Sequence, residues 1–247
     1  MPATQMVRRW KYQISYHYYL WFNYSKAQPF LFGQQLDTVI LCLMKRLLLI
    51  YTAFIFWGCQ PDANQKQASI QPKILPVIVV QPLDNFDSAT LQQIQAGIAA
   101  FYPVKVVIAQ RTNFPQKAWY APRKRYRADS TIAWLKTIQP ANTRCILAIT
   151  KQDISTTKGQ ITDFGVMGLG YQPGVSCVVS LYRLRGGGVG DSVVYNRFLK
   201  TILHELGHNF GLPHCPDKTC IMADAEGKLS QDKEQGLCNT CLHKIKI

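Results

Sequence analysis

The sequence contains no apolar run long enough for a membrane-spanning helix, and no internal repeat is visible in it. The apolar stretch 47–57 has eleven residues, whereas a helix that crosses a bilayer needs about twenty. A membrane-spanning anchor and a repeat architecture are therefore both disfavoured. The roughly 175 residues after position 72 are enough for one domain with its own core.

Acidic residues are also scarce, which leaves the chain strongly basic. There are 14 Asp and Glu against 28 Lys and Arg, for a net charge of +14; without residues 1–58 the counts are 13 and 22, and the net charge is +9. The densest basic cluster, Arg123–Arg127, is most simply a solvated face, although it could contact phosphates, anionic lipid headgroups or acidic substrates. Because no aromatic-interleaved binding motif accompanies the cluster, we expect no nucleic-acid partner.

Histidine is rare as well, yet three of the five histidines fall within eleven residues. His204 and His208 are four residues apart, so on a helix they share one face and can bind one metal ion. Glu205 lies beside them and can act as general base on a metal-bound water. Gly211 can adopt the left-handed conformation that ends a helix and turns the chain back. His214 then becomes a third ligand, and a fourth position stays open for water.

Four cysteines follow the histidines in two groups. Cys215 adjoins the third histidine, Cys220 comes five residues later, and Met222 follows it. Cys238 and Cys241 form a second close pair. This spacing matches a four-thiolate structural zinc site. Two disulfides are the alternative if the protein matures in an oxidising compartment.

The pattern HExxHxxGxxHC, followed by CxM and CxxC, resembles that of the archaemetzincin (archaelysin) family of zinc peptidases, over roughly residues 74–247. The resemblance implies a metzincin-like α/β (α+β) fold, in which a mixed twisted sheet with flanking helices carries a zinc-binding active-site helix and a small cysteine-rich C-terminal subdomain. It implies two zinc ions per chain, a catalytic one on His204, His208 and His214 with Glu205 as base, and a structural one on Cys215, Cys220, Cys238 and Cys241. Met222 would be the Met-turn methionine beneath the catalytic zinc.

The same resemblance implies peptide or protein substrates, with aminopeptidase or short-peptide cleavage favoured, and we expect a monomer. In metzincins the substrate usually lies antiparallel to an edge strand above the metal. The predicted strand Phe164–Tyr171 is our candidate, because its glycines allow close backbone approach. The alternative function is a non-catalytic zinc-binding envelope lipoprotein; a degenerate enzyme would typically have lost Glu205 or a histidine, and this chain has lost neither.

The N-terminal part of the chain has the features of an export signal. Residues 44–58 combine a short basic region, an apolar run and a small residue before Cys59. This is typical of a bacterial lipoprotein signal, with Cys59 as the lipid-bearing first residue of the mature chain. Residues 59–73 are polar and predict a flexible tether, whereas residues 1–43 are interpreted as a non-native extension upstream of the true start. We therefore expect lipid anchorage to the membrane of a bacterial cell envelope, with the domain in the periplasm or outside; a cytoplasmic protein is the alternative.

Residues 74–247 alternate between strand and helix patterns, as expected for a peptidase domain with this fold. Apolar and β-branched runs predict strands at 74–83, 104–109, 145–150, 164–171 and 175–184. Capping and periodicity predict a helix over Asp87–Phe101, a second around residues 132–138, and the active-site helix from Ser192. Cys145 and Cys177 lie within apolar strands and are interpreted as small buried hydrophobes.

Overall fold

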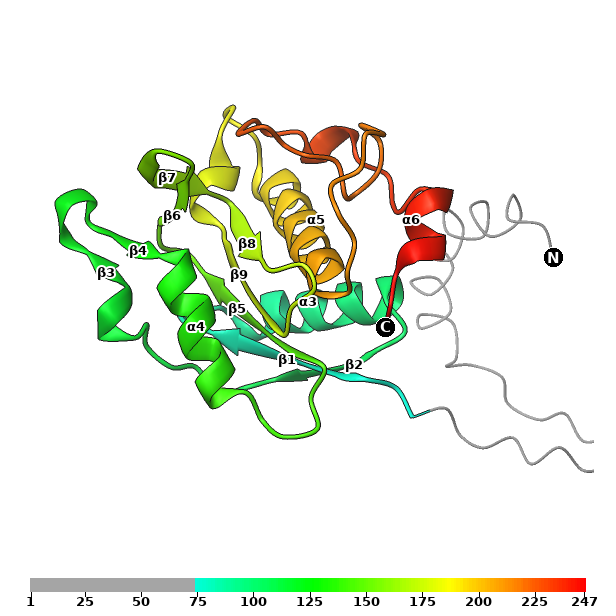
Figure 1. Ribbon diagram of the computed structural model, residues 1–247, viewed down its shortest axis with the longest axis horizontal. Helices are drawn as coiled ribbons and strands as arrows, with labels where there is room; N and C mark the ends of the chain where they lie inside the picture. Colours follow the sequence, from blue (N-terminus) through cyan, green and yellow to red (C-terminus); the bar gives the residue numbers. More distant parts are fainter. Residues whose placement is uncertain (1–73) are drawn as a thin grey trace, which may run out of the picture. The chain divides into compact units, whose positions relative to one another are not determined.

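The computed structural model describes residues 74–247, so the predictions for residues 1–73, including Cys59, lie outside the described residues. The described residues form a sheet with helices on both faces, and a C-terminal segment passes beside the last long helix (Figure 1). Within residues 74–247, no helix combines the length and the apolar character needed to cross a membrane.

The centre of the domain is a five-stranded sheet in the order β2-β1-β5-β9-β8. Its strands are β1 (Val77–Pro82), β2 (Lys105–Ile108), β5 (Cys145–Thr150), β8 (Gly168–Gly170) and β9 (Ser176–Ser180). Four of them are parallel, whereas β8 runs antiparallel to β9 and forms one edge of the sheet. The mixed sheet that the resemblance implied is therefore confirmed.

Helices cover both faces of this sheet. The helices are α3 (Ser88–Phe101), α4 (Ala128–Ile138) and α5 (Asp191–Asn209). Because strand side chains alternate between faces, Ile78 and Leu147 pack in the cluster with α3 and α5, whereas Val79 and Ile146 pack in the cluster with α4. Burial on both faces explains why the central strands are continuous apolar runs rather than alternating ones.

A second sheet, which the sequence analysis missed, has the order β3-β4-β6-β7. Its strands are β3 (Trp119–Tyr120), β4 (Arg125–Arg127), β6 (Ile154–Lys158) and β7 (Ile161–Val166). This sheet corrects the interpretation of the basic cluster as a solvated face. Arg125 is only 8% exposed, and its guanidinium pairs with the carboxylates of Asp153 and Asp163. The centre of the cluster is therefore part of an internal ion-pair network.

The prediction of one strand over Phe164–Tyr171 was wrong in one respect, because this stretch contains parts of two strands. Its first residues end β7 in the second sheet, and Gly168–Gly170 form β8 at the edge of the first. The predicted strand 175–184 is also shorter than expected. β9 ends at Ser180, whose hydroxyl accepts the N–H of Tyr182 at 3.1 Å, and a 3-10 helix over Tyr182–Arg185 follows.

The C-terminal segment, residues 215–247, contains little regular structure. It includes a short 3-10 helix, η4 (Gln231–Lys233), and α6 (Asn239–Lys244). Isolated bridges join Cys215 to Ala223 and Cys220 to Gly236. In Figure 1 this orange-to-red segment runs along α5, so it can contribute residues to a site on that helix.

Candidate active site

The chain reverses direction where α5 ends. Gly211 has a φ of +89°. Its N–H donates to the carbonyl of His208, and the N–H of Leu212 donates to the carbonyl of Gly207, both at 2.9 Å. This pair of bonds is the Schellman arrangement, in which glycine takes the left-handed position without strain. The prediction for Gly211 is confirmed.

The reversal gathers three imidazole rings around one point. The candidate ligand atoms of His204, His208 and His214 all lie within 4.8 Å of one another, and the ring centroids are 4.6 to 5.4 Å apart. Zinc bound to nitrogen at about 2.0–2.1 Å in a tetrahedron requires nitrogens roughly 3.4 Å apart. Small rotations of the side chains would meet that requirement, so the three histidines fit one zinc ion.

Hydrogen bonds to backbone carbonyls select the tautomer of two of these rings. His204 Nδ1 lies 2.7 Å from the carbonyl oxygen of Ile221, and His208 Nδ1 lies 2.8 Å from that of Leu212. A carbonyl only accepts, so each Nδ1 carries the proton and each Nε2 keeps a free lone pair for a metal. Burial lowers the pKa of His204 to about 3 and also lowers the pKa of His208, which keeps both rings neutral. The sequence analysis missed Ile221 and Leu212, because a backbone acceptor has no sequence signature.

The Glu205 carboxylate lies beside the histidines, beneath the edge strand β8. Glu205 is 7% exposed, and burial raises its pKa to about 8, although the backbone N–H of Gly170 acts in the opposite direction. A Cβ on Gly168 would lie 2.6 Å from Glu205 Oε1, and one on Gly170 would lie 2.7 Å from the Glu205 carbonyl oxygen. The strand can therefore approach this helix only because both positions are glycine.

Met222 lies under the histidine-bearing part of α5. Its side chain is fully buried, and its sulfur packs so closely on Gly207 that a Cβ at that position would clash. Gly207 lies between the ligands His204 and His208 in the sequence. The role of Met222 as the Met-turn residue, which the resemblance implied, stays a prediction.

The four C-terminal cysteines form a second cluster, and all four sulfurs lie within 4.8 Å of one another. The Sγ–Sγ distance is 3.6 Å for Cys215 and Cys238, and 3.7 Å for Cys220 and Cys241. Four sulfurs at about 2.3 Å from a zinc ion would be roughly 3.8 Å apart. A hydrogen bond from the backbone N–H of Cys241 lowers the pKa of the Cys238 thiol to about 7, which favours a thiolate ligand. All four are free cysteines, so the alternative of two disulfides is not what the structure contains.

A cavity of about 700 Å³ opens above the histidines and Glu205. Its other walls come from β6, β7, β8 and the C-terminal segment. The polar residues of that segment that line the cavity include three that the sequence analysis did not single out and that matter below: Asp224, Gln231 and Glu234. Asp224 Oδ2 lies 3.6 Å from His214 Nδ1 and is therefore placed to orient the exposed third histidine. None of the three belongs to a motif, and only the folding of the segment over α5 reveals them.

Comparisons with known proteins identify the family. The sequence profile of peptidase family M54 matches residues 78–247. The archaemetzincin of Haloquadratum walsbyi is 27% identical over 173 residues, which cover 67% of this chain and 96% of that protein. The archaemetzincin of Pyrococcus horikoshii is 32% identical over 164 residues, covering 63% of this chain and 85% of that protein.

Solved structures of similar proteins agree. The crystal structure of the archaemetzincin from Archaeoglobus fulgidus, complexed with malonate, has 25% identity and a TM-score of 0.57, and the match covers 68% of this chain and 99% of that one. The archaemetzincin structure from Methanopyrus kandleri has 24% identity and a TM-score of 0.60. The match covers 70% of this chain and 95% of that one, and it supports the fold. The profile match spans more than half of the chain, and so the chain belongs to peptidase family M54, the archaemetzincin family of zinc metallopeptidases.

Proposed function

We propose that the chain hydrolyses peptide bonds at the histidine cluster, with zinc on His204, His208 and His214 and with Glu205 as general base. The observation that carries this proposal is the Glu205 carboxylate, which is buried beneath an edge strand and lines the same cavity as the three histidines. Burial raises the pKa of Glu205. A zinc dication on the histidines would lower this pKa again, so that the carboxylate would be ionised and able to accept a proton.

The residues of the chain would bind the peptide and move the protons. The free edge of β8 lines the cavity, so an extended substrate can add to it as an antiparallel strand. Glu205 then accepts a proton from the attacking water and passes it to the leaving amine. Zinc held by the histidines would supply Lewis acidity, which lowers the pKa of water from about 15.7 towards 7 and polarises the peptide carbonyl.

We also propose that the four cysteines hold a second, structural zinc, for two zinc ions per chain. The sulfur separations of 3.6 and 3.7 Å support this proposal. Three of the four cysteines are buried, and structural sites typically use four protein ligands without an open position.

For the substrate, we propose aminopeptidase or short-peptide cleavage. The cavity supports it, because about 700 Å³ accommodates a few residues of a peptide. The C-terminal segment, from Ala223 to Leu229, forms one of its walls. A long folded substrate would have to pass that wall.

The direct test is mass spectrometry of a mixed peptide library incubated with the zinc-loaded full chain. A zinc-loaded Glu205→Gln chain is the matched control, because it keeps the shape of the side chain and removes the base. We expect cuts only with the unchanged chain, and their positions distinguish exopeptidase from endopeptidase action. If neither chain cuts any peptide at full zinc occupancy, the peptidase mechanism fails and a non-catalytic zinc-binding protein takes its place.

Localisation remains a proposal based on residues 44–59. We propose that Cys59 carries a lipid that tethers the domain to a bacterial envelope membrane. The intact mass of membrane-extracted protein tests this, since acylation adds mass to a chain that begins at Cys59. A soluble, unmodified chain that begins at Met1 would favour the cytoplasmic alternative.

A further inference from the structure

The wall of the active-site cavity contains a buried acceptor without a donor. Gln231 is 4% exposed, and its Oε1 has no hydrogen-bond partner among the described residues. Its Nε2 faces Met167 Sδ at 3.4 Å and Thr201 Oγ1 at 3.5 Å. An unpaired buried acceptor is costly to fold, and each such group calls for a functional or structural reason.

Glu234 lies beside it on the same short turn and is 5% exposed. The only side-chain hydrogen bond that its carboxylate has among the described residues is from Ser230 Oγ, at 3.2 Å. Its carboxylate forms no ion pair within residues 74–247. Burial accordingly raises the pKa of Glu234 to about 7. The structure therefore places a buried carboxylate and a buried, unpaired amide oxygen three residues apart on one turn. Lys200 acts on the carboxylate through its charge, without a salt bridge.

The neighbouring charged groups are already engaged. Lys200 Nζ donates to the backbone carbonyls of Gln231 and Glu234, both at 2.6 Å. Asp232 pairs with Arg197 at 2.6 Å. These contacts anchor the turn on α5. They leave Gln231 Oε1 without a donor and the Glu234 carboxylate with the Ser230 hydroxyl as its one side-chain donor among the described residues.

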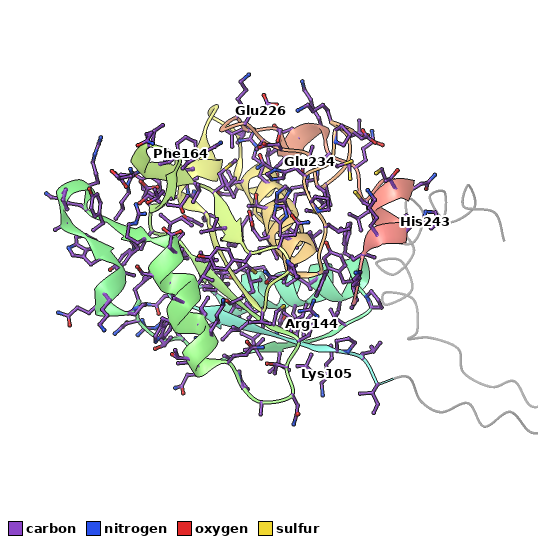
Figure 2. The ribbon with its side chains drawn as sticks, in the orientation of Figure 1. Lys105, Arg144, Phe164, Glu226, Glu234 and His243 are labelled. Atoms are coloured by element: carbon purple, nitrogen blue, oxygen red, sulfur yellow. The ribbon has the colours of Figure 1, made fainter. Side chains whose placement is uncertain are left out.

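The two acceptors lie within reach of the reacting bond. Gln231, Glu234, His204 and Glu205 all line the same cavity. Thr201, which Gln231 contacts, precedes Glu205 by one helical turn, roughly 6 Å along α5. Figure 2 shows Glu234 next to α5, on the side of the C-terminal segment. A group one residue away from a scissile bond at the histidines could therefore reach the pair.

We infer that Glu234 and Gln231 form a subsite for an ammonium group of the substrate, a specificity that rests on the proposed peptidase function. An ammonium has three donors and no acceptor, so it can pair with the carboxylate and with the amide oxygen together. Charge-assisted hydrogen bonds of this kind are the strong ones. The ammonium has two possible sources in a peptide, a free α-amino group or a lysine side chain.

Binding measurements on the zinc-loaded full chain with Glu205→Gln test the subsite without cleavage. Isothermal titration would compare short peptides in matched pairs: free against acetylated at the N-terminus, and lysine against norleucine at each position. We expect one of the two substitutions to weaken binding at least tenfold, and the pair that responds identifies the source of the ammonium. Adding Glu234→Gln should remove this preference, whereas Glu226→Gln, which removes an equal charge from an exposed cavity residue paired with Lys218, should keep it.

A second variant covers the event that Glu234→Gln fails to fold. Gln231→Met removes the unpaired oxygen and keeps the volume, and we expect it to reduce the preference about threefold to tenfold with no loss of melting temperature. The subsite is wrong if the paired peptides bind equally, or if Glu234→Gln weakens charged and neutral peptides by the same factor. Cleavage without charge preference would overturn the subsite alone. Charge preference in a chain that cuts no peptide would overturn the peptidase proposal and leave the subsite standing.

Discussion

The histidine cluster and the cysteine cluster lie close in sequence but differ in how they meet solvent. The histidine cluster offers three candidate metal ligands and opens into a cavity. One of them, His214, has a side chain that is 50% exposed. The cysteine cluster offers four candidate metal ligands, and one of them, Cys220, is only 1% exposed. A metal with an open position can do chemistry, whereas a metal with four protein ligands stabilises a fold. This contrast supports our proposal that the histidine cluster is catalytic and the cysteine cluster structural.

The two clusters are also connected through the backbone. Cys215 directly follows His214, and its N–H donates to the carbonyl of Met222 at 2.7 Å. The neighbouring carbonyl of Ile221 accepts the Nδ1 proton of His204. The segment that contains the cysteines thus orients a histidine of the other cluster, so we expect loss of a cysteine to disturb the histidine cluster.

The largest effect that separates the clusters should come from Glu205→Gln. This change removes the proposed base from the open site, and we expect peptide cleavage to fall by about 10²–10⁴-fold. Because the carboxylate is not among the candidate ligands, zinc content and melting temperature should stay near those of the parent. Cleavage assays with zinc analysis of the same samples check this; substantial residual activity would rule out Glu205 as the base.

For Cys241→Ser we expect the opposite result, in which zinc content and stability fall directly and peptide cleavage falls as a consequence. We expect zinc per chain to fall from two towards one and the free energy of unfolding to fall by several kcal/mol, since metal binding contributes directly to folding. Cleavage should fall as well, through Ile221 and His204. Cys145→Ser is the control, because Cys145 is also buried but lies in β5 and is not part of the cluster. Unchanged zinc content in Cys241→Ser would contradict the closed site.

A smaller effect is expected from Gly168→Ala in β8. The added Cβ would lie 2.6 Å from Glu205 Oε1, so strand or carboxylate has to move, and we expect roughly a 10²-fold loss of kcat/KM. Gly236→Ala is the matched control, because no atom lies within 4 Å of its Cβ position. Equal activity in Gly168→Ala and the parent would show that β8 and Glu205 do not need to be in close contact.

The smallest effect concerns pH. Burial raises the pKa of Glu234 from 4.5 in the unfolded chain to about 7, so the folded state binds the extra proton and loses stability as pH rises from about 4.5 to 7. Glu234→Gln has no such proton to lose. The free energy of unfolding of the variant, relative to that of the parent, should therefore increase by on the order of 2 kcal/mol between pH 4.5 and pH 8. Denaturant unfolding at both values checks this, and a difference independent of pH would mean that the carboxylate is not destabilised by burial.

The sequence correctly predicted features that depend on residues close together in the chain. Asp87 caps α3 as expected, because its carboxylate accepts the N–H of Thr90 at 2.8 Å. Cys145 and Cys177 are fully buried in strands, as predicted from their apolar neighbours. The spacing from His204 to His214 predicted a cluster because helix periodicity and one glycine turn determine it.

What the sequence could not reveal depends on contacts between distant segments. The second sheet contains strands of two and three residues, too short for a periodic pattern. Arg125 appeared to belong to a solvated face, since its partners Asp153 and Asp163 lie 28 and 38 residues further along the chain. Gln231 and Glu234 belong to no motif, and they line the cavity only because their turn packs on α5.

The most direct measurement is stepwise chelation of the zinc-loaded full chain, with zinc content, peptide cleavage and circular dichroism followed in the same samples. If the open histidine cluster is the catalytic site and the closed cysteine cluster the structural one, the first zinc to leave should abolish cleavage while the fold persists. The second should leave only as the C-terminal segment unfolds. Cleavage that survives loss of the first zinc and disappears with the second, or that persists in the metal-free chain, would contradict this division between the two clusters.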